Sequence, residues 1–242
     1  MKVAVVTGAS RGIGEAIARK LASNGFSLSI CCNNSADKLY ALADELREAY
    51  STTILTHVGN IADADFVKSM INDTLKEFGH IDVLVNNAGR AYIGLLSDMR
   101  ISEWDDLLQT NLSSVFYTCK NVIPNMVHNK SGHIINISSV WGNVGASMEV
   151  AYSATKGGIN SLTKALAKEL APSGIAVNAI ACGVIDTQMN NQLNDEEKND
   201  LADEIPAGRF GTPNEVADCV YSLINSSNYL TGQIITLDGG WT

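Results

Sequence analysis

The sequence predicts an α/β fold in which helices cover both faces of one doubly wound parallel sheet of seven strands. The first observation is an alternation along the chain between short β-branched stretches and segments with helical periodicity. The second is that each connection is long enough for the helical crossover that parallel neighbours require. The 242 residues, 45% of them hydrophobic, show no shift in composition that would mark a linker, so we expect residues 1–242 to form a single domain.

The expected strands follow one another along the whole chain, with helical periodicity between the first six and after the sixth. We expect them to pair in the Rossmann-type order 3-2-1-4-5-6-7. They are residues 3–7, 27–32, 53–57, 83–86, 133–138, 176–180 and 233–237.

Composition excludes several classes of function. The formal net charge of −9 argues against nucleic acid or an anionic membrane as the main partner. The five cysteines contain no Cys-x-x-Cys pair, and Cys31 and Cys32 would point to opposite faces of a strand, so reduced thiols are expected rather than disulfides. The four histidines show no ligand spacing, so we expect no metal site. The chain starts with a strand pattern and has no apolar run of ~18 residues, which predicts a cytoplasmic protein.

A glycine-rich turn follows the first strand. Residues 7–14 read Thr-Gly-Ala-Ser-Arg-Gly-Ile-Gly and lead directly into an expected helix over residues 15–24, which Gly25 ends. Glycines let the backbone approach a pyrophosphate closely, and the start of the helix favours its negative charge. The turn therefore predicts a dinucleotide cofactor.

The end of the second strand favours NADPH over NADH. An acidic residue there would bind a free ribose 2′-hydroxyl and repel a 2′-phosphate, but residues 31–35 contain no acid and the first one is Asp37. Arg11 lies in the turn, where it can meet a phosphate, and Asn33 or Ser35 can donate hydrogen bonds to it. The alternative is that Arg11 is a solvated residue at the helix start.

Two later segments are expected beside the same cofactor. After the third strand, Asp63 is expected to cap a helix over residues 64–78, which places Asn60 and Ile61 at the carboxyl edge of the sheet near an adenine. The fourth strand ends in the small, amide-rich segment 86–89, Asn-Asn-Ala-Gly, where the chain must pass close to the cofactor.

The expected catalytic pair lies in the segment 150–170. Tyr152 and Lys156 are four residues apart, so on a helix they lie on one face, one turn apart. Free tyrosine titrates near pH ~10, and a nearby cation favours its phenolate. Reduction of a ketone places negative charge on its oxygen, so two hydroxyl donors, Tyr152 and Ser139, are expected to converge there. Ser138 is the competing serine.

In order and spacing, these residues resemble the short-chain dehydrogenase/reductase family over essentially the full chain. The resemblance implies a catalytic tetrad of Asn111, Ser139, Tyr152 and Lys156. Tyr152 would be the proton donor, Ser139 would bind the substrate oxygen, Lys156 would bind the nicotinamide ribose, and Asn111 would hold a water that relays protons. The matching residues are Thr7, Gly8, Gly12, Gly14, Asn86 to Gly89, Asn111, Ser139, Tyr152, Lys156 and Leu237 to Gly240. The implied cofactor-binding set is Gly8, Ser10, Arg11, Gly12, Ile13, Gly14, Asn33, Asn60, Ile61, Asn87, Ala88, Gly89, Tyr152, Lys156, Gly183, Val184 and Thr187.

Within the family, the chain is similar to the branch that reduces 3-oxoacyl groups on acyl carrier protein. Of the two positions where such reductases often carry a basic contact for the carrier near the site entrance, Lys130 keeps the charge and Ser173 does not. Residues 138–150 look like a smaller branch, similar to the reductase of the 5-aminopentanone group on elongation factor P. Glu149 would suit the cationic amine of that substrate, or it is a carboxylate favoured by the helix start.

Further expectations concern Cys182, the segment 190–204 and the assembly of subunits. Cys182 stands where the family usually has proline, and it either loosens the loop over the nicotinamide or packs there. Residues 190–204 resemble the family's mobile substrate lid. The apolar faces of helices 101–128 and 151–171 exceed what one sheet face can cover, and the resemblance implies that they pair between subunits, as a homotetramer. The alternative of another class, a redox sensor without turnover, usually loses the tyrosine or lysine that this chain keeps.

Overall fold

The sheet has the expected topology. A computed structural model of the protein describes residues 1–190 and 194–242. Its seven strands lie in the order β3-β2-β1-β4-β5-β6-β7, and every neighbouring pair is parallel, which confirms the predicted fold class. The boundaries lie within two residues of those expected: β1 (Lys2–Thr7), β2 (Phe26–Cys32), β3 (Ile54–Val58), β4 (Val83–Asn86), β5 (Gly132–Ser139), β6 (Ile175–Cys182) and β7 (Ile234–Leu237).

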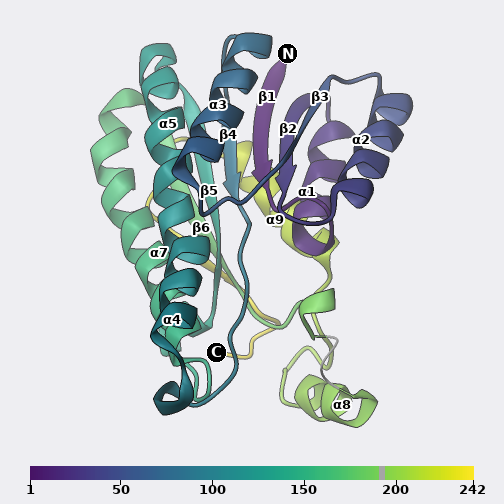
Figure 1. Cartoon of the computed structure of the whole chain (residues 1–242), viewed down its shortest axis with the longest axis vertical. Helices are drawn as coiled ribbons and strands as arrows, with labels where there is room; N and C mark the ends of the chain where they lie inside the picture. The colour runs from purple at the N-terminus through teal and green to yellow at the C-terminus, as the bar shows by residue number, and fades with distance from the viewer. Residues whose placement is uncertain (191–193) are drawn as a thin grey trace.

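Helices connect successive strands and cover the sheet on both sides (Figure 1). The cap of the third helix is as expected, because the Asp63 side chain accepts hydrogen bonds from the backbone N–H groups of Asp65 and Phe66. The described helices are α1 (Gly12–Ala22), α2 (Ala36–Tyr50), α3 (Ala64–Phe78), α4 (Ile101–Leu108), α5 (Ser114–Asn129), α6 (Trp141–Val144), α7 (Val150–Leu170), α8 (Asp195–Asp203) and α9 (Pro213–Ile224).

Two helices differ from their expected bounds. The first begins at Gly12, earlier than the expected residue 15, because the last two glycines of the turn already lie in its first turn, after an extended Arg11. The expected helix over residues 101–128 is interrupted by a π-helical turn at Gln109–Ser113, which separates α4 from α5. Single π turns of this kind are frequent at functional sites.

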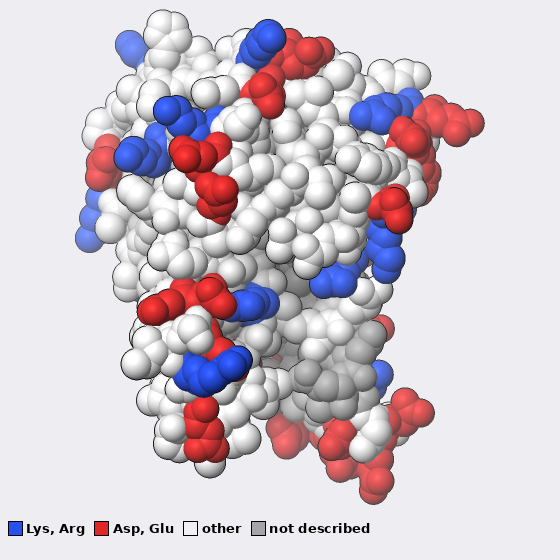
Figure 2. Space-filling view, viewed as in Figure 1, with Lys and Arg blue, Asp and Glu red and all other residues white. Residues whose placement is uncertain are grey.

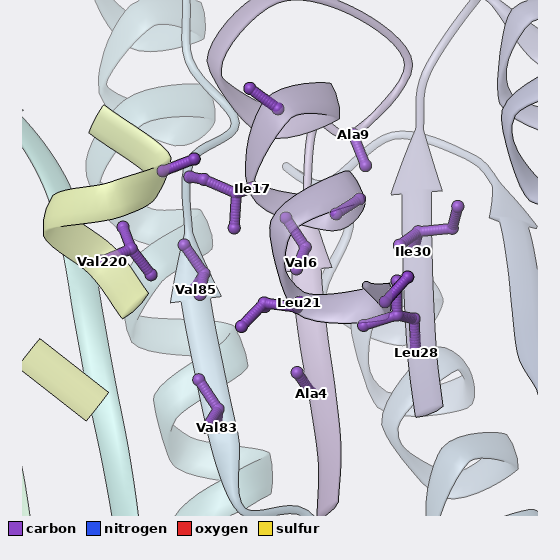
Figure 3. Close-up of a cluster of buried hydrophobic side chains, with 14 of the residues drawn as sticks. Ala4, Val6, Ala9, Ile17, Leu21, Leu28, Ile30, Val83, Val85 and Val220 are labelled. Carbon is purple, nitrogen blue, oxygen red and sulfur yellow. The ribbon is translucent and has the colours of Figure 1, made fainter. Parts of the chain in front are cut away.

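The core consists of two apolar layers, one on each face of the sheet. One layer packs α1, α2 and α9 against the strands, and Figure 3 shows Ile17 and Leu21 of α1 and Val220 of α9 lying over β1, β2 and β4. The other layer packs α3, α5 and α7 against the opposite face. Cys32 belongs to the first layer and Cys31 to the second, as the alternation of a strand requires.

The strand order reverses between β1 and β4, the neighbours at which the chain leaves one half of the sheet for the other. In open α/β sheets, ligands bind in the crevice outside the carboxyl ends of the strands at such a switch point. Within the described residues, no helix is long and apolar enough to cross a membrane.

Candidate active site

A cavity of about 1400 Å³ opens at the carboxyl edge of the sheet. One part of its wall is the glycine turn after β1 and the loop after β2, and another is the end of β5 together with the first turns of α7. Residues from both halves of the sheet therefore meet at the switch point. The cavity is large enough for a dinucleotide and a second molecule beside it.

The glycine turn is held against the end of β4 by hydrogen bonds. The Thr7 hydroxyl accepts from the backbone N–H groups of Asn87 and Ala88, both at 3.0 Å. The Asn87 carboxamide donates to the carbonyls of Thr7 and Gly8, at 2.9 and 3.1 Å. A Cβ atom on Gly14 would lie 2.2 Å from the Gly8 carbonyl oxygen, and Gly8 has a φ of +68°, so both positions require glycine. The start of α1 is thereby left open toward the cavity as a cradle for an anion.

The structure brings nearly all of the expected cofactor residues to one cavity. Gly14 is the exception, because it supports the turn from behind rather than facing the cavity. The expected cofactor residues that line the cavity are Gly8, Ser10, Arg11, Gly12, Ile13, Asn33, Asn60, Ile61, Asn87, Ala88, Gly89, Tyr152, Lys156, Gly183, Val184 and Thr187. Their glycine cradle and open helix start fit a nicotinamide dinucleotide.

The end of the cavity beside β2 has the character expected of a 2′-phosphate site. Exposed Arg11 and Asn33 line it together with Ser35, the residue that precedes α2, and no acidic side chain of residues 31–35 lies there. Arg11 also donates a weak hydrogen bond of 3.5 Å to Gln188. Cys31 and Cys32 line the same wall, which the sequence did not indicate.

Ser139 and Tyr152 lie together at the other end of the cavity. The Ser139 side chain works to lower the pKa of Tyr152, which places the two hydroxyls near each other. The Ser139 oxygen also accepts from the backbone N–H of Trp141 at 3.2 Å. Ser138, the competing serine, points instead to Asn160, to which its hydroxyl donates at 2.6 Å. Ser139 is therefore the serine that shares the cavity with Tyr152 through its hydroxyl.

Lys156 lies one turn after Tyr152 but faces a different partner. Its ammonium donates to the Ile137 carbonyl at 2.9 Å and lies 5.5 Å from the centroid of the Tyr152 ring. Burial lowers the pKa of Lys156 to about 8, so the group is still largely protonated at neutral pH. Desolvation raises the pKa of Tyr152 despite the nearby Ser139 hydroxyl. In this structure the desolvation of the phenol sets the direction of the shift, and the Lys156 ammonium is turned to a backbone carbonyl.

Asn111 lies behind the cavity rather than in its wall. It belongs to the π turn and is fully buried. Its carboxamide accepts from the backbone N–H of Arg90 at 2.9 Å and donates to the Arg90 carbonyl at 2.8 Å and to the Thr155 hydroxyl at 3.2 Å. Both ends of the side chain are thus engaged with the Arg90 backbone and α7.

Glu149 lies in the cavity wall beside two tryptophans. It precedes α7, but its side chain makes no cap hydrogen bond and instead accepts from the Trp141 indole at 3.1 Å. The Trp141 and Trp241 rings are 4.9 Å apart, and both line the cavity. Burial raises the pKa of Glu149. Trp241 was not anticipated as a site residue, because it lies at the far end of the chain, where Asp238 accepts hydrogen bonds from Gly240 and Thr242 and fixes the tail.

The expected carrier contacts lie at the opposite edge of the sheet. Lys130 caps the end of α5 and Ser173 precedes β6, so both lie at the amino ends of strands. Ser139 ends the eight-residue strand β5, a rise of roughly 25 Å from that edge. The expectation that Lys130 lies near the site entrance is therefore wrong within one chain. The acidic residues that line the cavity are Asp106, Glu149 and Glu204.

The expected lid falls partly on residues 191–193, which lie outside the described residues. The described remainder forms α8, whose first turn carries Asp195, Glu196 and Glu197. Acidic side chains gather on this helix at the lower right of Figure 2. Leu201 and Glu204 line the same cavity as Tyr152.

Comparisons with known proteins agree with this geometry. A family model described as short chain dehydrogenase matches residues 2–198. A 3-oxoacyl-[acyl-carrier-protein] reductase FabG of Staphylococcus aureus is 44% identical over 240 residues, which cover 99% of this chain and 97% of that protein. An uncharacterized oxidoreductase YmfI of Bacillus subtilis is 39% identical over 241 residues, with 99% and 98% covered. The crystal structure of a variant of actinorhodin polyketide ketoreductase with NADPH is 33% identical, with a TM-score of 0.94 over 99% of this chain and 97% of that one.

Proposed function

The chain belongs to the short-chain dehydrogenase family of oxidoreductases, and from this premise we propose that it is an NADPH-dependent ketone reductase. The observation that carries the proposal is the meeting of the Ser139 and Tyr152 hydroxyls in one cavity with the glycine cradle. The bound nicotinamide would supply a hydride to the carbonyl carbon. Every other part of the reaction would come from groups of the chain.

In this proposal Ser139 and Tyr152 act on the carbonyl oxygen. As that oxygen gains negative charge, both hydroxyls donate to it, and Tyr152 gives up its proton to form the alcohol. The Trp141 N–H occupies a lone pair of the Ser139 oxygen, which leaves the serine proton to be donated. The positive charge of Lys156 in its buried position would favour the phenolate that remains, and its ammonium would also bind the nicotinamide ribose. Asn111 fixes Arg90 and, through its backbone, holds the water that returns a proton.

Arg11 would select NADPH by binding the 2′-phosphate. Asn33 and Ser35 would add hydrogen bonds from the loop after β2, and the start of α2 would favour the charge. The match to a ketoreductase solved with NADPH supports the same choice.

The substrate proposed first is a 3-oxoacyl thioester on a carrier. Its support is the 44% identity, over nearly the whole chain, to a protein named as a 3-oxoacyl-[acyl-carrier-protein] reductase. The wide cavity leaves room for a chain that enters from outside. Since Lys130 lies at the opposite edge, contact between it and a carrier would have to come from a neighbouring subunit.

A second substrate, the 5-aminopentanone group on elongation factor P, is favoured by the wall at Glu149. A carboxylate next to Trp141, whose ring packs against that of Trp241, is a suitable environment for a protonated amine. The acids that line the cavity also repel the anionic groups of an acidic carrier.

One pair of variants separates the two substrates. Glu149→Gln should raise KM for an aminoketone about tenfold, since an ion pair at a half-exposed site contributes roughly 1 kcal/mol, and should leave KM for an acetoacetyl thioester unchanged. Asp106→Asn is the matched control, because it removes an equal charge from the same cavity at a site beside Arg90. If Glu149→Gln changes KM equally for both substrates, the aminoketone proposal is wrong. If the wild type reduces neither substrate, the proposed function as a whole is contradicted.

The proposed assembly is a homotetramer. Apolar side chains lie exposed on the helices expected to pair, including Ile101 of α4, Phe116 of α5 and Val150 of α7. Burying them against a second copy would remove apolar surface from water. Light scattering on the purified protein tests this directly, and a monomer at micromolar concentration would refute it.

A further inference from the structure

The two hydroxyls of the site come from different elements, so their distance depends on how those elements are joined. Ser139 is the last residue of β5, and Tyr152 lies in the first turn of α7. For both to reach one carbonyl oxygen, the end of the strand must be fixed on the helix to within a fraction of an ångström. This requirement rests on the proposed ketone reduction.

Asn160 joins these elements on both sides of Ser139. Its carboxamide oxygen accepts the Ser138 hydroxyl at 2.6 Å, and its NH₂ group donates to the Asn143 carboxamide oxygen at 2.8 Å. Asn160 is 6% exposed, so its amide has little access to water as a substitute partner. The strand end and the turn that follows Ser139 are therefore both tied to α7.

The turn that follows Ser139 also packs directly on the helix backbone. A Cβ atom on Gly142 would lie 2.7 Å from the carbonyl carbon of Lys156 and 2.9 Å from the Asn160 amide nitrogen. The same turn supplies the Trp141 N–H that orients the Ser139 hydroxyl. A shift of this turn away from α7 would move the Ser139 hydroxyl and its N–H partner together.

We call Asn160 and its hydrogen bonds to Ser138 and Asn143 the clamp. The spacing along α7 places this clamp in register with the reactive groups. Tyr152, Lys156 and Asn160 follow at intervals of four residues and lie on one face of the helix. The helix thus carries the proton donor, the buried cation and the clamp in three successive turns.

We propose that Asn160 is a positioning residue that fixes Ser139 relative to Tyr152 by its hydrogen bonds to Ser138 and Asn143. It does not touch substrate or cofactor. Loss of the clamp should slow hydride and proton transfer without weakening the binding of NADPH, because the glycine cradle lies on other elements. A displacement of about 1 Å between catalytic groups can cost on the order of 10²-fold in rate.

The test compares variants of the clamp with a control variant that breaks another buried hydrogen bond between β5 and α7. Asn160→Ala and Asn143→Ala should lower kcat by about 10- to 100-fold while the NADPH Kd and binding stoichiometry stay within twofold. Asn143→Asp keeps the acceptor oxygen and should recover most of the rate. The control is Thr163→Val, which breaks the Asn136–Thr163 hydrogen bond between β5 and α7 farther from Ser139 and should leave kcat near wild type.

The outcomes distinguish this inference from the proposed function. If the wild type reduces ketones but kcat of Asn160→Ala lies within twofold of the wild-type value, only the positioning role is overturned. The same holds if Thr163→Val lowers kcat as much as Asn160→Ala does. A crystal structure of Asn160→Ala supplies a readout that does not depend on turnover. Residues 139–144 should move away from α7 in that structure, and an unchanged position of Ser139 relative to Tyr152 would overturn the inference.

Discussion

Replacing Lys156 by methionine should make the folded protein more stable at neutral pH. Burial lowers the pKa of this lysine to about 8, against an ordinary value of 10.5. At ~1.4 kcal/mol per pKa unit, keeping the charge buried costs roughly 3 kcal/mol at pH 7. Methionine is of similar length and carries no charge, but it removes the hydrogen bond to the Ile137 carbonyl, a loss of about 1 kcal/mol. Lys156→Met should therefore raise the free energy of unfolding by roughly 1 to 2 kcal/mol at pH 7.

The stability advantage of Lys156→Met should also depend on pH, and the pKa of Lys156 fixes the direction of that dependence. Below pH 8 the lysine is protonated in both the folded and the unfolded chain, so the cost of burial is fully present. Between pH 8 and the ordinary value near 10.5, the unfolded chain holds more protons than the folded chain, and the stability of the wild type rises with pH. The advantage of Lys156→Met should therefore shrink by about 1 kcal/mol between pH 7 and pH 9.

Urea unfolding followed by circular dichroism at both pH values measures this difference. Lys164→Met is the matched control, since Lys164 is an exposed lysine on the same helix, and it should change stability by less than about 0.5 kcal/mol at either pH. A Lys156→Met protein that is less stable than wild type at pH 7, with a deficit that does not vary with pH, would refute the claim that the lysine is held charged at a cost to folding.

The remaining predictions concern the acid, the cofactor and the turn. Tyr152→Phe should lower turnover by about 10²-fold or more while NADPH still binds, and more than a third of wild-type turnover would remove the tyrosine from the mechanism. Arg11→Ala should weaken the binding of NADPH by roughly 1.5–3 kcal/mol and barely change the binding of NADH, as measured by fluorescence titration. Equal losses of affinity for both cofactors would contradict the 2′-phosphate assignment. Gly14→Ala should abolish binding of either cofactor, because its Cβ atom would lie 2.2 Å from the Gly8 carbonyl oxygen, and an unchanged Kd would show that the turn is not the cradle.

The fold could be predicted closely because its determinants are local. Strand periodicity, crossover length and caps such as Asp63 are properties of short segments, and they specified the sheet order and most boundaries. The break between α4 and α5 was missed, since a π turn leaves no pattern in residue types. Buried Asn111 of this turn bonds to the Arg90 backbone, a tertiary contact that residue patterns do not reveal.

The site was predictable only for residues that carry recognisable chemistry in a fixed motif. Trp241 and Asn160 reach the site region through the packing of the C-terminal tail and of α7, and neither belongs to a motif. Lys130 was placed near the site entrance from the resemblance alone, although its position before β5 puts it at the other edge of the sheet. The direction of the Tyr152 pKa shift depends on how far the cavity wall desolvates the phenol, which spacing along a helix does not reveal.

The most direct test of the central claim is NADPH consumption by the purified protein, measured with wild type and Tyr152→Phe side by side. The substrates are an acetoacetyl thioester and 5-aminopentanone-modified elongation factor P, each offered with NADPH and with NADH. Wild type should oxidise NADPH in the presence of at least one of these ketones, and Tyr152→Phe should be slower by about 10²-fold. Tight binding of NADPH without turnover of either ketone, or equal rates for the two proteins, would contradict the central claim.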